Sequence, residues 1–229
     1  MLSSRGRSAI LALMLLLAAA GIMAAVGRNT PKAAPETLVD VVGRWDASVE
    51  ERIRDIRTDP MIEVSNALDL LGGSLVLVPL RIAVLVLLGA LRRFSGFFAF
   101  ALTWAITQPS SELLKGWLHR GRPPVSLPGS LVDVTSFAMP SGHTVAFASI
   151  AVAAAIAFAT GWWRGGLVIA GFLAGALMGA SRLVLSAHWL SDVVVGVLFG
   201  GGIAIASAVL VDAIAERMPD RPPVRLGRG

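Results

Sequence analysis

Long apolar runs alternate with polar segments along the chain. A helix needs about 20 apolar residues to cross the hydrocarbon core of a bilayer, and the runs here are continuous, unlike the alternating strands of a membrane barrel. We therefore predict an all-α, polytopic membrane protein with six transmembrane helices, at about residues 8–26, 70–91, 94–114, 144–161, 166–185 and 189–212. No internal repeat or low-complexity linker divides the chain, so residues 1–229 are expected to form a single domain.

A shorter periodic pattern lies between the first two runs. Apolar residues recur there every three or four positions, at Leu38, Val42, Trp45, Val49, Ile53 and Ile56. Charged residues fill the other face, so this segment is predicted to be an amphipathic helix, preceded by a break at Pro31 and Pro35. The helix is expected either to lie on the outer leaflet or to pack on another segment of the protein.

The basic residues predict the orientation of the spans. If six spans alternate, the arginines beside them all fall on one side, namely Arg5, Arg7, Arg92, Arg93, Arg164, Arg217, Arg221, Arg225 and Arg228. That side is expected to be cytoplasmic and to hold both termini, while the loops 27–69, 115–143 and 186–188 face outward. A cleaved signal peptide is the alternative for the first run. A retained anchor is favoured, because five spans would leave the two chain ends on opposite sides.

Composition supports the membrane class. Of the residues, 55% are hydrophobic and 15% are charged, and the mean hydropathy is +0.73. The absence of cysteine excludes disulfides, thiolate catalysis and cysteine-ligated metals. The net charge of +5 comes from basic residues at the chain ends and in short loops, a distribution that favours orientation signals over nucleic-acid binding.

Two features of the spans have no assigned role. Arg81 falls midway along the second run, where a charge is costly, and it either snorkels toward the cytoplasm or marks a misplaced boundary. Small residues spaced by four in the fifth run would permit close packing against another span or another subunit. These are Gly171, Gly175 and Gly179.

Polar residues gather at the predicted outer ends of the spans, and the first group follows the third run. It contains Lys115, His119, Arg120 and Arg122. Basic residues at a membrane boundary commonly anchor lipid headgroups, but these lie on the outer side, where fewer are expected. His119 and Arg120 are interpreted as solvent-facing spacers.

The second group is Pro140 to His143, immediately before the fourth run. At the start of a helix, Ser141 and Gly142 would present free backbone N–H groups, an arrangement suited to holding a phosphate. The alternative is an ordinary helix cap with a solvated histidine.

The third group contains Arg182, His188 and Asp192. Histidine and aspartate four residues apart share one face of a helix, so the carboxylate can accept a hydrogen bond from one imidazole nitrogen and leave the other nitrogen free. A carboxylate in a span is costly without such a partner, which makes Asp192 a functional candidate.

Together the three groups match the needs of phosphoryl transfer. The cations Lys115, Arg122 and Arg182 can neutralise nonbridging oxygens. One histidine can attack phosphorus while the other protonates the departing oxygen. A metal site made of two histidines and a carboxylate would be disfavoured by three nearby cations, so neither a metal nor another cofactor is expected.

These residues resemble the type 2 phosphatidic acid phosphatase superfamily, whose signature is Lys-x6-Arg-Pro, Pro-Ser-Gly-His and Ser-Arg-x5-His-x3-Asp. Every signature position is matched here. The resemblance implies a six-helix membrane fold with a site similar to that of soluble acid phosphatases and vanadium haloperoxidases. It also implies that His188 forms a phosphohistidine, that Asp192 orients it, and that His143 protonates the leaving group before activating water. The residues implied to hold the phosphate are Lys115, Arg122, Ser141, Gly142 and Arg182.

The function expected from this resemblance is hydrolysis of a phosphomonoester or pyrophosphate on a lipid of the cell membrane. Polyprenyl pyrophosphate is the favoured substrate, with phosphatidic acid and phosphatidylglycerol phosphate as alternatives. A vanadate-dependent haloperoxidase and a non-enzymatic lipid-binding protein are the competing hypotheses. The predicted spans argue against the first and the complete signature against the second. The expected partners are the lipid and the bilayer, without nucleic acid.

Overall fold

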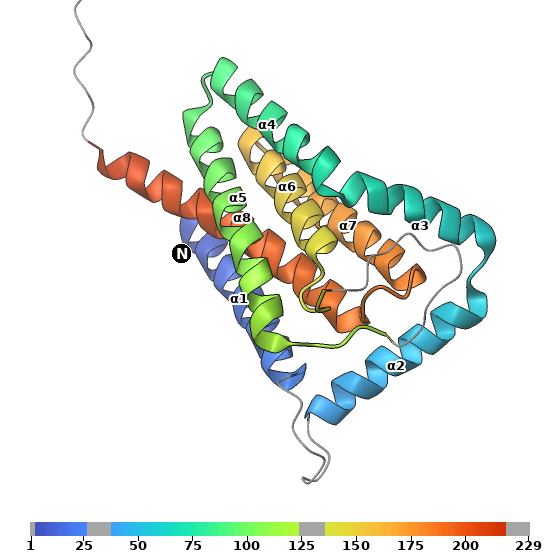
Figure 1. The fold of residues 1–229 in the computed structure, drawn as a ribbon. Coiled ribbons are helices and arrows are strands. Elements are labelled where there is room, and N and C mark those ends of the chain that lie inside the picture. Colours follow the sequence, from blue (N-terminus) through green and yellow to red (C-terminus); the bar gives the residue numbers. More distant parts are fainter. Residues whose placement is uncertain (1–2, 27–37, 124–135, 219–229) are drawn as a thin grey trace, which may run out of the picture.

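The computed structural model describes residues 3–26, 38–123 and 136–218, and every regular element within them is a helix. The helices are α1 (Ser4–Val26), α2 (Leu38–Ile56), α3 (Asp59–Gly72), α4 (Ser74–Ala90), α5 (Phe94–Leu118), α6 (Gly142–Phe158), α7 (Trp163–Val184) and α8 (Leu190–Arg217). They form one bundle, with α3 and α4 along one edge and α2 across one end (Figure 1). The expectation of an all-helical fold is confirmed.

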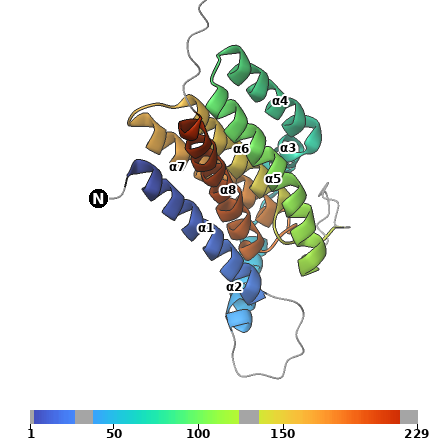
Figure 2. The same ribbon diagram turned by 90° about the vertical axis from the view of Figure 1, so that its left-hand side faces the viewer.

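Three closely packed helices form the centre of the bundle. Helix α6 packs on both α7 and α8, and α1 lies along α8 (Figure 2). Glycines allow this close approach: a Cβ at Gly175 would lie 2.7 Å from the Ala148 Cβ, and one at Gly200 would lie 2.5 Å from the Val145 carbonyl oxygen. The small residues of the fifth run therefore face neighbouring helices of the same chain, as seen at Gly171, Gly175 and Gly179.

The structure supports fewer membrane spans than the six predicted. Among the described residues, α1, α7 and α8 are long and apolar enough to cross a membrane. Helices α3 and α4 meet the same criterion only as a pair bent by 51°, which raises the number to four. Helix α6 is apolar but only 17 residues long. Six spans therefore stay a prediction.

The second predicted span is not one continuous helix. The chain is helical from Asp59, well before the predicted start at residue 70, and breaks at Gly73. Gly73 is extended, with φ −73° and ψ 159°, and caps both helices. The prediction of a single helix over 70–91 was wrong. The apolar pattern continues across Gly72 and Gly73, so it gives no sign of the bend between the two helices.

The amphipathic helix is present as α2, but it packs with its acidic residues inward. Asp46 and Glu50 are 2% and 8% exposed, whereas Trp45 and Ile56 are both 66% exposed. Helix α2 contacts α1, α7 and α8, so it packs on the protein through acidic groups and presents apolar groups outward. Its position on a lipid surface stays a prediction. The predicted break at Pro31 and Pro35 lies outside the described residues.

Helix α1 packs into the bundle. Ala12 and Ala19 are buried, and Arg5 forms an ion pair with Glu216 near the end of α8. The retained first helix stays a prediction, as does the cytoplasmic side. Three of the arginines used to assign that side, Arg221, Arg225 and Arg228, lie outside the described residues.

Candidate active site

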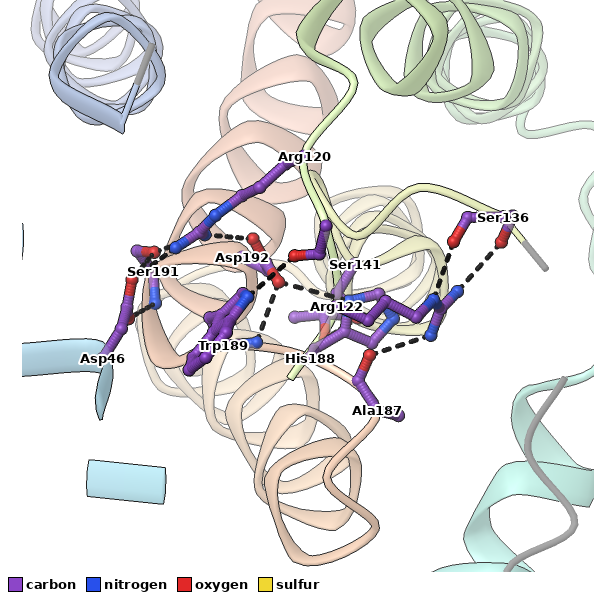
Figure 3. Close-up of polar contacts among 12 residues, drawn as sticks. Asp46, Arg120, Arg122, Ser136, Ser141, Ala187, His188, Trp189, Ser191 and Asp192 are labelled. Carbon is purple, nitrogen blue, oxygen red and sulfur yellow. Dashed lines mark hydrogen bonds and ion pairs between the residues drawn. The ribbon is translucent and has the colours of Figure 1, made fainter. Parts of the chain in front are cut away.

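The three predicted groups meet at one end of the bundle. They occupy the end of α5 and the residues after it, the start of α6, and the α7–α8 connection (Figure 3). A left-handed residue, His119 with φ 48°, ends α5 and turns the chain back toward the bundle. The Ala138 N–H then donates a hydrogen bond to the Arg120 carbonyl oxygen at 2.9 Å, which joins the first group to the segment that leads into α6.

The α7–α8 connection buries His188. The Ala187 N–H donates to the Arg182 carbonyl oxygen at 3.0 Å, and Ser186 adopts a left-handed φ of 48°. Trp189 then caps α8, because its N–H donates to the Asp192 side chain at 2.8 Å. His188 is thus held in a short turn between two helices, with only 3% of its surface exposed.

Asp192 lies beside the His188 ring, but the two do not share a helix face as predicted, because His188 precedes the first residue of α8. The His188 Nδ1 atom is 3.5 Å from Asp192 Oδ2, longer than a well-formed hydrogen bond. A proton on Nδ1 that faces this carboxylate leaves the Nε2 lone pair free. Burial lowers the pKa of His188 to about 4, against the opposing effect of Asp192. The imidazole is therefore neutral near pH 7 and able to act as a nucleophile.

Two guanidinium groups lie next to His188. Arg122 donates to the Ala187 carbonyl oxygen at 2.8 Å and, through Nε, to the Ser136 carbonyl oxygen at 2.8 Å. Arg182 is buried, and its Nε atom has no hydrogen-bond partner among the described residues. Both cations are close enough to lower the pKa of His188 further, after the larger effect of burial. The pocket around this imidazole is therefore positive and suited to an anion.

The start of α6 lies against the same pocket. Ser141 is buried, and its N–H donates to the Asp192 carbonyl oxygen at 3.2 Å. Lys115 reaches the first residue of α6, because a Cβ built at Gly142 would lie 3.3 Å from the Lys115 Nζ atom. Lys115 also pairs with Glu112 at 2.8 Å. The helix N-terminus and a lysine ammonium thus add to the positive character of this end of the bundle.

His143 joins the site through an aspartate that the sequence analysis missed. Its Nε2 atom lies 3.0 Å from Asp69 Oδ1, and Asp69 also forms an ion pair with Arg182. An acidic residue beside an apolar run was the available signal, since such a carboxylate is costly without partners. All eight predicted residues are now connected through direct contacts or one intervening residue.

A second missed residue, Gly72, fixes the position of the His143 ring. A Cβ at Gly72 would lie 2.2 Å from the His143 Cδ2 atom, a distance that real atoms do not tolerate. The last turn of α3 therefore lies directly against the imidazole. Nothing in the sequence marks this glycine as part of the site.

The interpretation of Arg120 as a solvent-facing spacer was wrong. Its side chain is 14% exposed and forms ion pairs with both Asp192 and Asp46. Asp46 also accepts hydrogen bonds from Ser191, at 2.9 Å from the N–H and 2.6 Å from Oγ. Helix α2 is therefore attached to the start of α8 through charged groups. His119 is exposed, as predicted.

No cluster suited to a metal ion is found in the part of the chain that the structure describes. Within residues 3–26, 38–123 and 136–218, no group of three or more histidine, aspartate or glutamate side chains could hold one. The metal-free chemistry expected from the sequence stays a prediction, and chelation tests it directly.

Comparison with known proteins gives one family. The family model described as the PAP2 superfamily matches residues 95–215. A Klebsiella pneumoniae protein, described as an uncharacterized 22.5 kDa protein in the cps region, is 31% identical over 164 residues, which cover 69% of this chain and 72% of that protein. Phosphatidylglycerophosphatase B of Bacillus subtilis is 29% identical over 170 residues, covering 68% and 77%.

A solved structure shares the fold. The crystal structure of a transmembrane PAP2-type phosphatidylglycerolphosphate phosphatase from Bacillus subtilis superposes with a TM-score of 0.72 and 23% identity. The superposition covers 91% of this chain and 98% of that one. The helical arrangement seen here is therefore that of a known transmembrane protein.

Proposed function

Since this chain belongs to the PAP2 superfamily of lipid phosphatases, we propose that it removes the terminal phosphate of a membrane lipid through a phosphohistidine intermediate on His188. One observation carries the proposal: a neutral, buried histidine lies beside two guanidinium groups and a carboxylate at one end of a helical bundle. That set supplies a nucleophile, an anion-binding pocket and a group that orients the nucleophile.

The first chemical step transfers the phosphoryl group to the protein. The His188 Nε2 lone pair attacks phosphorus, and the bond between phosphorus and the lipid oxygen breaks. His143 in its protonated form donates a proton to that oxygen, so the lipid leaves as an alcohol or as a shorter phosphate. Asp69, whose Oδ1 atom is 3.0 Å from His143 Nε2, would hold the imidazole in place during this transfer.

The second step restores the histidine. His143, now neutral, takes a proton from water while the water oxygen attacks the phosphohistidine. The bond between phosphorus and Nε2 breaks, and inorganic phosphate leaves with His188 free again. Through both steps Arg122, Arg182, Lys115 and the N-terminus of α6 would stabilise the charge on the nonbridging oxygens.

The membrane arrangement is part of the same proposal. We place the site at the outer face of the cell membrane, with the first helix retained and both termini cytoplasmic. The positions of the arginines support this orientation. In this arrangement α5, α6 and the bent pair α3–α4 complete six passages. A lipid would enter between helices, with its headgroup reaching the end of the bundle.

Two lipids lead as substrates. Polyprenyl pyrophosphate is favoured from the sequence, and phosphatidylglycerol phosphate is indicated by the name of the Bacillus subtilis relative. In both lipids a phosphate is the last group of the polar headgroup, so the same site could cleave either.

Purified protein in detergent is expected to release phosphate from lipid phosphates at a rate that EDTA does not change. The reason is that the proposed charge stabilisation comes from arginine and lysine side chains and not from a metal ion. Phosphate release would be measured with polyprenyl pyrophosphate, phosphatidylglycerol phosphate and phosphatidic acid, with and without chelator. A folded protein that releases phosphate from none of them would overturn the proposed function, and loss of activity with EDTA would overturn the metal-free mechanism.

Substitution of Gly72 by alanine is expected to lower kcat by about 100-fold, because a displacement of a catalytic group by about 1 Å costs that much. The new methyl group would push the His143 ring away from the site. The matched control is Gly116→Ala, where a Cβ meets nothing within 4 Å. The rates and the thermal unfolding of both variants would be compared. Equal rates for the two variants would show that the position of His143 is not critical.

A further inference from the structure

A pocket extends from the candidate site along the inside of α4. Its volume is about 430 Å³, and it lies between α4, α5 and α6. Lys115, Gly142 and His143 line one end, and Arg81 lines it together with Trp104 and Gln108. The proposed reaction uses only the end that holds Lys115 and His143, so most of the pocket lies outside the region where phosphate is cleaved.

Arg81 is buried inside the bundle. It lies in the middle of α4 and is 4% exposed. Its guanidinium donates a hydrogen bond to the Gln108 side-chain oxygen at 3.3 Å and lies 5.3 Å from the centre of the Trp104 ring. Both partners are neutral, and no acidic side chain among the described residues forms an ion pair with Arg81.

The pocket contains a second buried polar group without a matching partner. Ser111 lines this pocket and is 3% exposed, yet its Oγ atom has no hydrogen-bond partner among the described residues. A buried hydroxyl without a partner is costly, as is a buried guanidinium without an anion. Both costs would be offset by a ligand that brings acceptor oxygens into the pocket.

The distance between Arg81 and the candidate active site can be estimated along helices α5 and α4. Gln108, which contacts Arg81, precedes Lys115 by seven residues on α5, or about 10 Å at about 1.5 Å per residue. Along α4, Arg81 follows Gly73 by eight residues, or about 12 Å. Gly73 adjoins the glycine that contacts His143. Arg81 is therefore about 10 Å from the end of the pocket where the phosphate would be cleaved.

We propose that Arg81 and Ser111 form a second anion site, which binds a phosphodiester of the lipid substrate while the terminal phosphate is cleaved beside His188. This inference rests on the proposed function and narrows its substrate class to lipids with two phosphates joined by a spacer. In a diphosphate the two phosphorus atoms share one oxygen. A glycerol between them adds three carbons and a second oxygen, which suits two cation sites that lie well apart.

The position of Arg81 agrees with such a substrate. A lipid that enters from the bilayer places its acyl chains deepest, its phosphodiester next, and its terminal phosphate nearest the end of the bundle. Arg81 and the active site follow the same order along the pocket. Exposed apolar residues on α4, such as Leu75 and Val86, leave the outer side of this helix suited to hydrocarbon.

The test is an Arg81→Gln variant assayed on three lipids. These are phosphatidylglycerol phosphate, which has a spaced phosphodiester, a polyprenyl diphosphate, which has adjacent phosphates, and phosphatidic acid, which has one phosphate. The variant is expected to lose about 10- to 100-fold in kcat/KM on the first lipid, as for a lost hydrogen bond to a charged group. The loss is expected mainly in KM and to be much smaller on the other two lipids.

Folding does not obscure this result, because the substitution removes a buried charge and glutamine can still bond to Gln108. Arg81→Lys is expected to restore part of the loss, and Leu75→Ala, a change on the exposed side of the same helix, is the matched control. Equal losses on all three lipids would show a merely structural role and overturn the inference. A selective loss on the diphosphate, or no loss at all, would overturn it as well.

A binding measurement separates this inference from the proposed function. In a His188→Ala background, the dissociation constants of the three lipids would be measured by competition with a fluorescent lipid. Arg81→Gln is expected to weaken phosphatidylglycerol phosphate selectively by a similar factor, and unchanged binding would overturn the second anion site. This readout needs no turnover, so it stands even if the parent protein releases no phosphate.

Discussion

Replacing His188 by alanine is expected to lower kcat at least about 10⁴-fold, the scale seen when a covalent nucleophile is removed from an enzyme. The imidazole is buried, neutral near pH 7 and flanked by two arginines. Without it the proposed phosphohistidine could not form. The residual rate would come from the arginines and the helix N-terminus acting on water.

The measurement is phosphate release together with trapping of the intermediate. Parent protein mixed with a lipid labelled in its terminal phosphate and quenched in base should retain label on histidine, because phosphohistidine survives base. The His188→Ala protein should retain none. His119→Ala is the matched control, since His119 is exposed and its ring lies against Phe137. Label on the His188→Ala protein, or full activity without His188, would rule out this nucleophile.

The motifs could be predicted from the sequence because their chemistry is local. Asp192 follows His188 by four residues, in the first turn of α8, and Ser141 and Gly142 begin an apolar helix, so short separations along the chain keep these groups together. The prediction that the three groups converge rested on the alternation of the predicted spans, which puts all three groups at the same side of the membrane. The contact between the Lys115 side chain and the start of α6 is visible only in the structure.

The residues that the sequence did not reveal act through contacts distant along the chain. Asp69 pairs with a histidine and an arginine that lie 74 and 113 positions away. Arg120 joins an aspartate in α2 to another in α8. Periodicity in α2 could show only that Asp46 faces away from the apolar stripe. Which of the two faces packs on the protein depended on a partner, Arg120, that no local pattern identifies.

Replacing Asp192 by asparagine is expected to lower kcat by about 10³- to 10⁴-fold, as for the orienting carboxylate of other histidine-dependent enzymes. We propose Asp192 as a positioning residue, because it lies beside Nδ1 of His188 and caps α8 through the Trp189 N–H. A carboxylate favours the proton on Nδ1 and leaves Nε2 free to attack. An asparagine that presents its NH₂ group to Nδ1 would favour the other tautomer, with a proton on the attacking nitrogen.

The distinguishing measurement is the tautomer itself, followed by nitrogen NMR of protein labelled at histidine. Parent protein should show His188 with a bare Nε2 near pH 7, and Asp192→Asn should shift the population toward a protonated Nε2. A merely structural role would lower activity and thermal stability without moving this population. Asp212→Asn, an exposed change further along α8, should affect neither. If Asp192→Asn lowers kcat while the tautomer is unchanged, Asp192 acts through the cap and its ion pair with Arg120, which also ties α2 to the site.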